Sequence, residues 1–119
     1  MNEIEFRIWD KTNKILLYQL KNSPYFGRFE DDRYVLLEDV LFYNDDFELM
    51  QYTRIKDKNN IKIYEGDICN IWIEGIKQKN KYVVKNLETL FYDMNNRDIY
   101  YRITAIEVVG NIHQNVNKK

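Results

Sequence analysis

The stretch from Phe47 to Ile73 constrains the fold of this chain more than any other part of its sequence. It contains three apolar runs that are separated by two polar turns, Lys56-Asp57-Lys58-Asn59-Asn60 and Glu65-Gly66-Asp67. Asparagine and glycine tolerate the left-handed backbone that tight turns require. The pattern therefore predicts a short antiparallel β-meander, with strands over residues 47–55, 61–64 and 68–74.

The third run of this meander is apolar on both of its faces. Cys69, Ile71 and Ile73 alternate there with Ile68 and Trp72. Such a strand needs cover on two sides, which either a small barrel or a second copy of the chain can supply. We therefore expect a discrete homo-oligomer, and light scattering that shows a monomer at high micromolar concentration would contradict this.

The remaining segments predict further strands. Residues 3–9 alternate between polar and apolar side chains, and with the apolar run at 15–18 they predict a hairpin over 4–20. Residues 22–32 hold the only proline and predict a loop. The segments that we expect to complete the sheet are 82–84, 99–104 and 106–112. Residues 34–43 and 87–94 fit either strand or helix; we interpret the first as strand-like.

Composition supports a mostly β chain, with at most a short helix. The aromatic content is 15%, and aromatic side chains pack well on pleated sheets. At 119 residues we expect one domain over 1–119. Within it, an N-terminal hairpin part (1–21), a loop (22–32) and a barrel part (33–114) are possible subdivisions.

Charge and cysteine content limit the cellular compartment and the kinds of partner that we expect. Lys and Arg number 18 against 19 Asp and Glu, without the basic excess that nucleic-acid binders usually carry. The single cysteine, Cys69, excludes an internal disulfide, fits a reducing compartment and is interpreted as a buried, inert thiol. No apolar run approaches the ~20 residues that cross a bilayer. We expect a soluble protein of the host-cell cytoplasm that does not contact a membrane.

Three segments together resemble the YopX family of phage and prophage proteins. They are Ile4-Glu5-Phe6-Arg7-Ile8-Trp9-Asp10-Lys11, the central segments Leu49-Met50-Gln51-Tyr52-Thr53, Lys56-Asp57-Lys58-Asn59 and Ile63-Tyr64-Glu65-Gly66-Asp67-Ile68, and Glu107-Val108-Val109-Gly110-Asn111-Ile112-His113. The resemblance implies a mostly β fold with an N-terminal hairpin and an SH3-like or partly open barrel. It also implies a phage or prophage origin, and it implies no reaction, substrate or cofactor.

The sequence departs from the family pattern at two positions where the family usually has glycine. These positions hold Arg54 and Asn60. Asn60 is an easy replacement at a turn position with positive φ. Arg54 implies that its position does not need positive φ, or that the family's glycine serves close packing there.

No group of residues predicts catalysis. His113 lies near the C-terminal end and is interpreted as a surface imidazole. Glu65 and Asp67 form a conceivable carboxylate or metal site, but a turn in which Asp67 bonds local backbone is favoured. Asp45, Asp46 and Glu48 form a second acidic cluster. We therefore expect no enzyme, no catalytic residues, no metal and no cofactor.

Binding is the favoured kind of function. The candidate interaction surface combines aromatic and lysine residues: Tyr52, Lys56, Lys58, Tyr64 and Trp72. Aromatic side chains in alternating strands are mostly core, and loop lysines mostly serve solubility. The leading hypothesis is a protein-interaction module that binds a protein partner or itself. The alternative is a small nucleic-acid-binding barrel in phage replication or regulation, with lysines and aromatics converging on one face.

Overall fold

A computed structural model describes residues 4–21, 23–28 and 31–114, and they form ten strands and two short helices. The prediction of a mostly β fold is confirmed. The described residues divide into two compact units, one of residues 4–51 and one of residues 52–114. We call these the N-terminal unit and the C-terminal unit. The interpretation of the chain as one domain stays a prediction.

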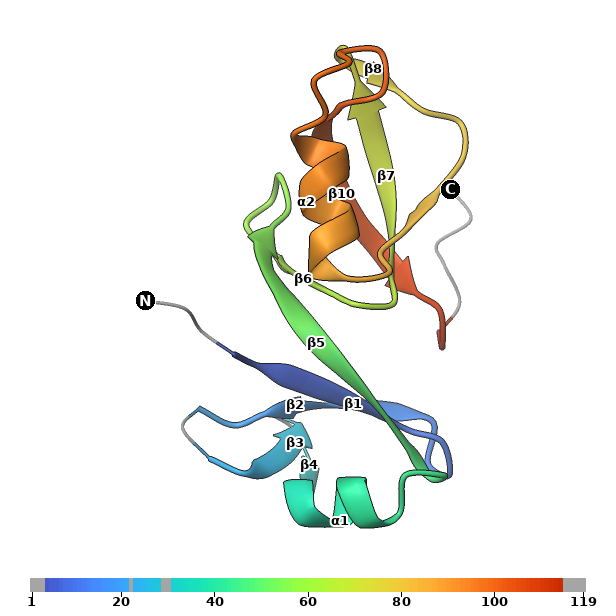
Figure 1. Cartoon of the computed structure of the whole chain (residues 1–119). Helices are drawn as coiled ribbons and strands as arrows, with labels where there is room; N and C mark the ends of the chain where they lie inside the picture. Colours follow the sequence, from blue (N-terminus) through green and yellow to red (C-terminus); the bar gives the residue numbers. More distant parts are fainter. Residues whose placement is uncertain (1–3, 22, 29–30, 115–119) are drawn as a thin grey trace. The chain divides into compact units, whose positions relative to one another are not determined.

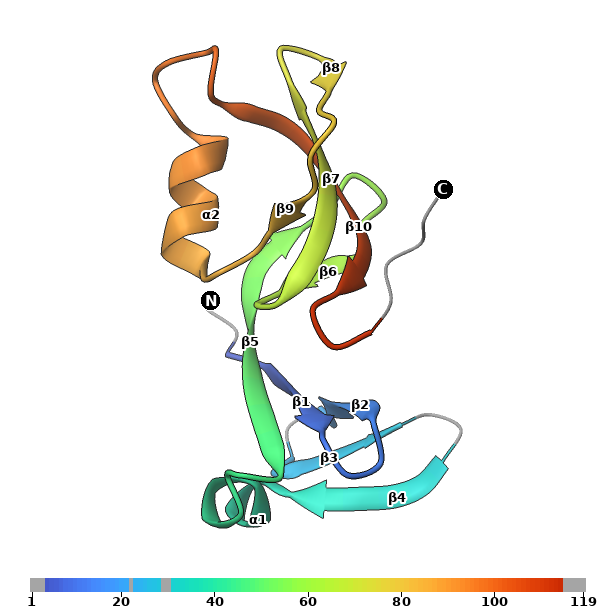
Figure 2. The ribbon, with the colours of Figure 1, turned by 90° about the vertical axis from the view of Figure 1, so that its right-hand side faces the viewer.

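The N-terminal unit is an antiparallel sheet followed by a one-and-a-half-turn helix (Figures 1 and 2). Its strands are β1 (Phe6–Asp10), β2 (Ile15–Gln19), β3 (Tyr25–Arg28), β4 (Asp31–Leu36) and the first half of β5 (Phe47–Lys56). Their order in the sheet is β4-β3-β2-β1-β5. Helix α1 (Leu37–Phe42) connects β4 to β5.

The predicted hairpin over 4–20 is confirmed. Its turn is held by Asp10, whose Oδ1 accepts hydrogen bonds from the backbone N–H groups of Thr12 and Asn13, each at 3.1 Å. The polar face of β1 is not solvent-exposed as the alternation predicts, because Arg7 and Trp9 are buried as well. Paired on both sides, β1 is a central strand of its sheet.

Two predictions between residues 22 and 43 are wrong. The expected loop over 22–32 contains β3 and the start of β4, while positions 22, 29 and 30 lie outside the described residues. The strand expected over 34–43 ends at Leu36, and α1 follows it. Tyr25 and Leu36 are cross-strand partners, and burial of Phe26 and Val40 in one core cluster favours a strand and a helix here.

The C-terminal unit contains the second half of β5, five further strands and one helix. These are β6 (Lys62–Tyr64), β7 (Asp67–Ile73), β8 (Ile76–Lys77), β9 (Tyr82–Val83), α2 (Leu87–Met94) and β10 (Ile103–Asn111). The strand order is β10-β7-β8, and β9 also pairs with β7 (Figure 2). Among the described residues these strands form open sheets and do not close into a barrel. The SH3-like likeness stays a prediction.

The three strands of the predicted meander form as expected, but their pairing differs. β5 pairs with β6, whereas β7 pairs with β10, β8 and β9. The turn at Gly66 therefore carries the chain from one ladder into another. Burial explains the change, because the Cys69 face of β7 packs into a core that β10 and α2 share.

The end of the chain is corrected in two places. Residues 99–101 form a turn rather than a strand, and β10 begins at Ile103. Ile112, which we expected in the last strand, lies in the turn after β10 and is half exposed. The β10–β7 register shifts between Val108 and Gly110, which places a β-bulge beside this glycine. For residues 87–94 the structure selects the helix.

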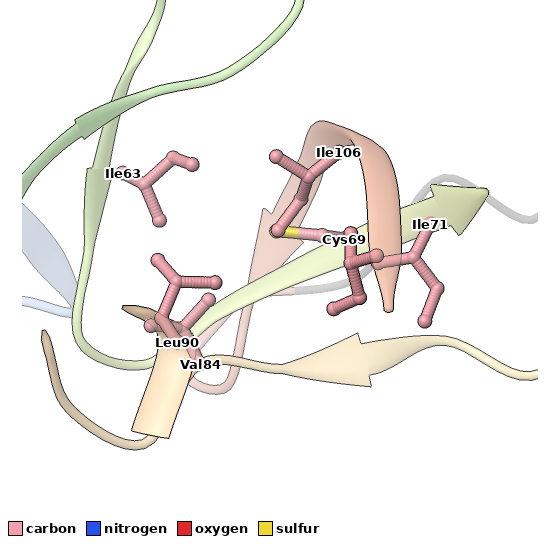
Figure 3. Packing of buried hydrophobic residues seen from close by; sticks show 7 residues of the cluster. Ile63, Cys69, Ile71, Val84, Leu90 and Ile106 are labelled. Carbon is pink, nitrogen blue, oxygen red and sulfur yellow. The ribbon is translucent and has the colours of Figure 1, made fainter. Parts of the chain in front are cut away.

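The core of the C-terminal unit gathers buried side chains from three strands, a loop and α2 (Figure 3). Its buried members are Ile63, Cys69, Ile71, Val84, Leu90, Ile103 and Ile106. In Figure 3, the Cys69 sulfur lies beside Ile106, and Leu90 lies beside Val84. Leu90 is the buried residue of α2, so this side chain anchors the helix to the sheet.

Arg54 adopts a left-handed backbone with φ of 69°, which contradicts the first of the two alternatives, that its position does not need positive φ. Asn60, with φ of 67°, has the positive φ expected of a turn position. The β5–β6 register shifts between Tyr52 and Lys56, which places Arg54 in a β-bulge. Thr53 stabilises this bulge, because its buried hydroxyl donates to the Ile63 carbonyl at 2.7 Å.

Candidate functional site

The structure divides the predicted interaction surface into two pairs and an exposed lysine. Tyr52 and Tyr64 are cross-strand partners whose ring centroids lie 5.5 Å apart. They are only 4% and 3% exposed, so neither ring offers contact area to a partner in this structure. Lys62 places its Nζ 5.2 Å from the centroid of the Tyr52 ring. Lys56 is exposed on the same hairpin. The proposed surface of five residues stays a prediction.

The second pair, Lys58 and Trp72, remains accessible. The Lys58 Nζ lies 4.5 Å from the centroid of the partly exposed Trp72 ring, a cation–π distance. Lys77 is the cross-strand partner of Trp72, and directly opposite residues share a face of the sheet. The two lysines therefore flank one indole. We call Lys58, Trp72 and Lys77 the Trp72 cluster.

A buried asparagine and a partly buried glutamate form a polar pair next to the Trp72 cluster along β7. Asn70 precedes Trp72 by two positions, so their side chains share one face of the strand. The Asn70 Nδ2 donates to Glu107 Oε1 at 3.1 Å. The Asn70 Oδ1 is buried and has no hydrogen-bond partner among the described residues.

Asp57 holds Lys58 in place beside β10. Its carboxylate accepts backbone hydrogen bonds from Asn59 at 2.8 Å and Ile61 at 2.9 Å, which closes the hairpin loop. The second oxygen accepts from the Val108 N–H at 2.8 Å. The Lys58 N–H donates to the Ile106 carbonyl at 2.9 Å. Sequence reasoning assigned Asp57 only to a loop, although an aspartate that opens such a loop can bond its backbone.

The Glu65-Gly66-Asp67 segment has the geometry of the favoured turn. Gly66 has φ of 88°, and the buried Asp67 accepts a hydrogen bond from the Tyr64 N–H at 2.8 Å. The Gly66 N–H donates to Val84, and the Ile112 N–H donates to the Gly66 carbonyl. This turn therefore connects β9 and the end of β10 to the start of β7.

Burial raises the pKa of two side chains in the C-terminal unit. Burial, and then the nearby Asp67 and Asp57, raise the pKa of the Cys69 thiol to about 12. The thiol is thus buried as predicted and protonated at neutral pH. Burial and a hydrogen bond from the Tyr82 hydroxyl to Asp93 at 2.6 Å raise the pKa of Tyr82 well above its usual range.

A search of the described residues found no group of three His, Cys, Asp or Glu side chains that is arranged to hold a metal ion. None of the helices in the described parts of the chain is long and apolar enough to cross a membrane.

The N-terminal unit carries a surface that sequence reasoning missed. A groove of about 360 Å³ is lined by Pro24, Leu36, Leu37, Glu38 and Leu41, and we call it the α1 groove. The end of α1 and the residue after it expose three side chains: Leu41, which also lines the groove, is 60% exposed, Phe42 77% and Tyr43 52%. The Phe42 and Tyr43 rings meet edge to face at 4.7 Å. The helical spacing of Leu37 and Leu41 was the available signal.

The neutral total charge also concealed a division between the units. Residues 1–51 contain 6 Lys and Arg against 11 Asp and Glu, whereas residues 52–119 contain 12 against 8. The Trp72 cluster therefore lies in a basic half and the α1 groove in an acidic half. Counting charge by segment would have found this from the sequence alone.

The chain is a small, mostly β protein that exposes aromatic and aliphatic side chains. The chain belongs to the YopX family, whose profile, described as YopX protein, matches residues 5–118. Among solved structures it is similar to protein EF1440 from Enterococcus faecalis, with a TM-score of 0.50, 22% sequence identity and coverage of 95% of each chain. At this level of sequence identity, the structural similarity shows a shared fold. A search of curated proteins gave no match.

Proposed function

We propose that this protein is a binding module that acts through protein contacts made by the surface of α1. The observation that carries the proposal is the run of Leu41, Phe42 and Tyr43, all more than half exposed beside an apolar groove. Large aromatic and aliphatic side chains are the usual energetic centre of protein interfaces. Their exposure on a free chain leaves apolar area that a partner can remove from water.

Site-specific photo-crosslinking tests this proposal. A benzophenone amino acid replaces Phe42 in the full chain, which is then irradiated in a host-cell lysate. The matched control carries the same group at Tyr101, an exposed aromatic of the C-terminal unit. We expect position 42 to give a discrete adduct whose added mass is that of a protein. Protease treatment should remove this added mass, and nuclease treatment should leave it unchanged. Equal adducts from both positions, or none from position 42, would refute the proposal.

The proposal extends to a phage or prophage accessory protein of the host cytoplasm that performs no catalysis. Membership of the YopX family supports the origin. The proposal also includes self-association as a second protein contact, made through β7, because apolar side chains lie on both faces of that strand. Light scattering at high micromolar concentration tests it, and a strictly monomeric chain would leave only a different protein as the partner.

Nucleic-acid binding is the second candidate, and the Trp72 cluster supports it. An accessible indole between two lysines offers a stacking face and charges for phosphate. The test is quenching of Trp72 fluorescence by a thymidine dodecamer at low salt, in a Trp9→Phe background that removes the other tryptophan. Quenching that falls steeply with salt, and falls again in Lys58→Ala and Lys77→Ala, would support it. Unchanged fluorescence would exclude this candidate.

A further inference from the structure

The α1 groove continues onto the outer face of the β3–β4 hairpin. Tyr25 and Leu36 are cross-strand partners, and Tyr34 precedes Leu36 by two positions, so the three side chains share one face. The intervening residue Val35 and its partner Phe26 point to the other face, into the core of the unit. Tyr25 is 46% and Tyr34 58% exposed. A partner can therefore contact the groove and this aromatic face together.

The charges around the α1 groove are acidic. Glu38 lines it, and Asp39 is exposed on the next position of the helix. Asp45 and Asp46 are exposed in the turn that follows α1, and no Lys or Arg occurs between residues 34 and 53. Among the described side chains, Lys21 is an exposed cation three positions before Pro24, and exposed Lys11 donates its backbone N–H to the Asp46 carbonyl. A neutral or acidic segment would therefore meet an excess of negative charge here.

We infer that the α1 groove binds a basic segment of another protein, one that inserts an aliphatic or aromatic side chain and flanks it with Lys or Arg. This inference rests on the proposed function and names the chemistry of the partner. The groove volume of about 360 Å³ is at the lower end of the ~300–1,000 Å³ of ligand pockets, which suits a side-chain anchor. The acidic rim supplies charge complementarity, which favours association and rejects like-charged competitors.

Peptide selection on the intact chain tests the inference. A random dodecapeptide library is displayed on phage and selected on the immobilised full chain, and enriched peptides are synthesised for fluorescence-anisotropy titrations. We expect enriched peptides to combine Lys or Arg with Leu, Ile or Phe. Their affinity should fall at least tenfold in the double variant Glu38→Lys/Asp39→Lys and in Leu41→Ser. Raising NaCl from 50 to 500 mM should weaken binding by a similar factor.

The matched control is Glu88→Lys, because Glu88 is the acidic residue in the first turn of α2 and is also exposed. It should change the affinity by less than twofold. A milder variant, Glu38→Gln/Asp39→Asn, removes the charge without repulsion and should still weaken binding at least threefold if the charge-reversed chain fails to fold. Equal loss in the Glu88→Lys control would overturn the inference.

Other outcomes separate this inference from the proposed function. Enriched peptides without a basic bias, or no enrichment at all, would overturn the inference. The proposed function would still stand if position 42 gave a protein adduct in the crosslinking experiment. Absence of that adduct would refute both. Peptides that match residues 76–85 of this chain, together with a dimer in light scattering, would assign the groove to a second copy and overturn the assignment to another protein.

Discussion

The two units stabilise their helices in different ways. In the C-terminal unit α2 begins with a side-chain cap, because Asn86 Oδ1 accepts from the Thr89 N–H at 2.8 Å. In the N-terminal unit the corresponding position of α1 is Leu36, which has no polar side chain, and the first N–H of the helix donates to the Pro24 carbonyl instead. Each helix buries one residue, Leu90 in α2 and Val40 in α1.

The units also differ in how they use carboxylates. Asp57 and Asp67 of the C-terminal unit are buried and accept backbone hydrogen bonds that connect turns to strands. In the N-terminal unit, Asp10 does this in one turn, while Glu38, Asp39, Asp45 and Asp46 are exposed. The comparison teaches that the C-terminal unit uses its polar groups for its own fold. The N-terminal unit leaves acidic and apolar groups at its surface, where a partner can use them.

Thiol reactivity should give the largest difference between the units. Because the pKa of Cys69 is raised from 9.0 to about 12, the thiolate fraction at pH 8 should be about a thousandfold lower than in the unfolded chain. A thiol placed on α1, as Phe42→Cys in a Cys69→Ser background, should react at the ordinary rate because Phe42 is exposed. Reaction with an aromatic disulfide, followed by absorbance, measures both.

The sign of the pH dependence follows from the same shift. The folded chain favours the neutral thiol, so its contribution to the free energy of unfolding is present below about pH 9 and is lost as pH rises towards about 12. Rapid reaction of native Cys69 at pH 8 would contradict the burial that distinguishes this unit.

Truncating the buried residue of each helix should separate the units energetically. Leu90→Ala should lower the free energy of unfolding by about 2–5 kcal/mol, and Val40→Ala by about 2 kcal/mol, because fewer buried carbon atoms are removed. Trp9 and Trp72 lie in different units, so urea unfolding in Trp9→Phe and Trp72→Phe backgrounds reads each one by fluorescence. We expect Leu90→Ala to shift the Trp72 signal more than the Trp9 signal. Equal shifts would show that the units unfold as one.

Removing the Asp57 carboxylate should loosen the hairpin and β10 together. Asp57→Ala leaves three backbone N–H groups without their acceptor, which should cost about 2–3 kcal/mol of stability. Hydrogen exchange should accelerate at Ile61 and Val108, which donate to this side chain. The control Asp45→Ala changes an exposed carboxylate of the N-terminal unit and should alter stability by less than about 0.5 kcal/mol. Unchanged hydrogen exchange at Val108 would show that Asp57 does not stabilise the contact between the hairpin and β10.

The smallest expected effect is a stabilising one in the bulge of β5. Arg54→Gly should raise the free energy of unfolding by about 0.5 kcal/mol, because glycine relieves a left-handed strain of about 1–2 kcal/mol but loses about 0.5–1 kcal/mol of chain entropy. Asn60→Gly is the control and should have a smaller effect, since asparagine tolerates this backbone. Urea unfolding measures both, and destabilisation by Arg54→Gly would indicate a role for the arginine side chain.

Most of the strands could be predicted from the sequence, because their evidence is local. Alternation along residues 4–9, the polar turns at 56–60 and 65–67, and the glycine in the last strand placed strands and turns within a few residues of their positions. The sequence did not decide between helix and strand at 87–94, and the strand-like interpretation of 34–43 was wrong after Leu36. Leu37 and Leu90 fit a helix and a strand equally until the surface that each contacts is known.

The candidate site was less predictable, because exposure depends on the whole unit. Tyr52, Tyr64 and Trp72 follow the same apolar pattern in sequence, yet the structure buries the first two and leaves Trp72 beside Lys58 and Lys77. The α1 groove combines Pro24 with Leu36 and Leu41, which are distant in sequence and meet only through the pairing of β3 and β4.

The sequence by itself determined the family, the mostly β fold, the main turns and the burial of the single thiol. It did so because turn chemistry and side-chain periodicity act over a few neighbouring residues. Tertiary structure alone decided that β7 leaves the meander to pair with β10, that Arg54 adopts a strained backbone, and which aromatics remain exposed. These outcomes depend on which distant surfaces bury most apolar area together, a property that no local pattern contains.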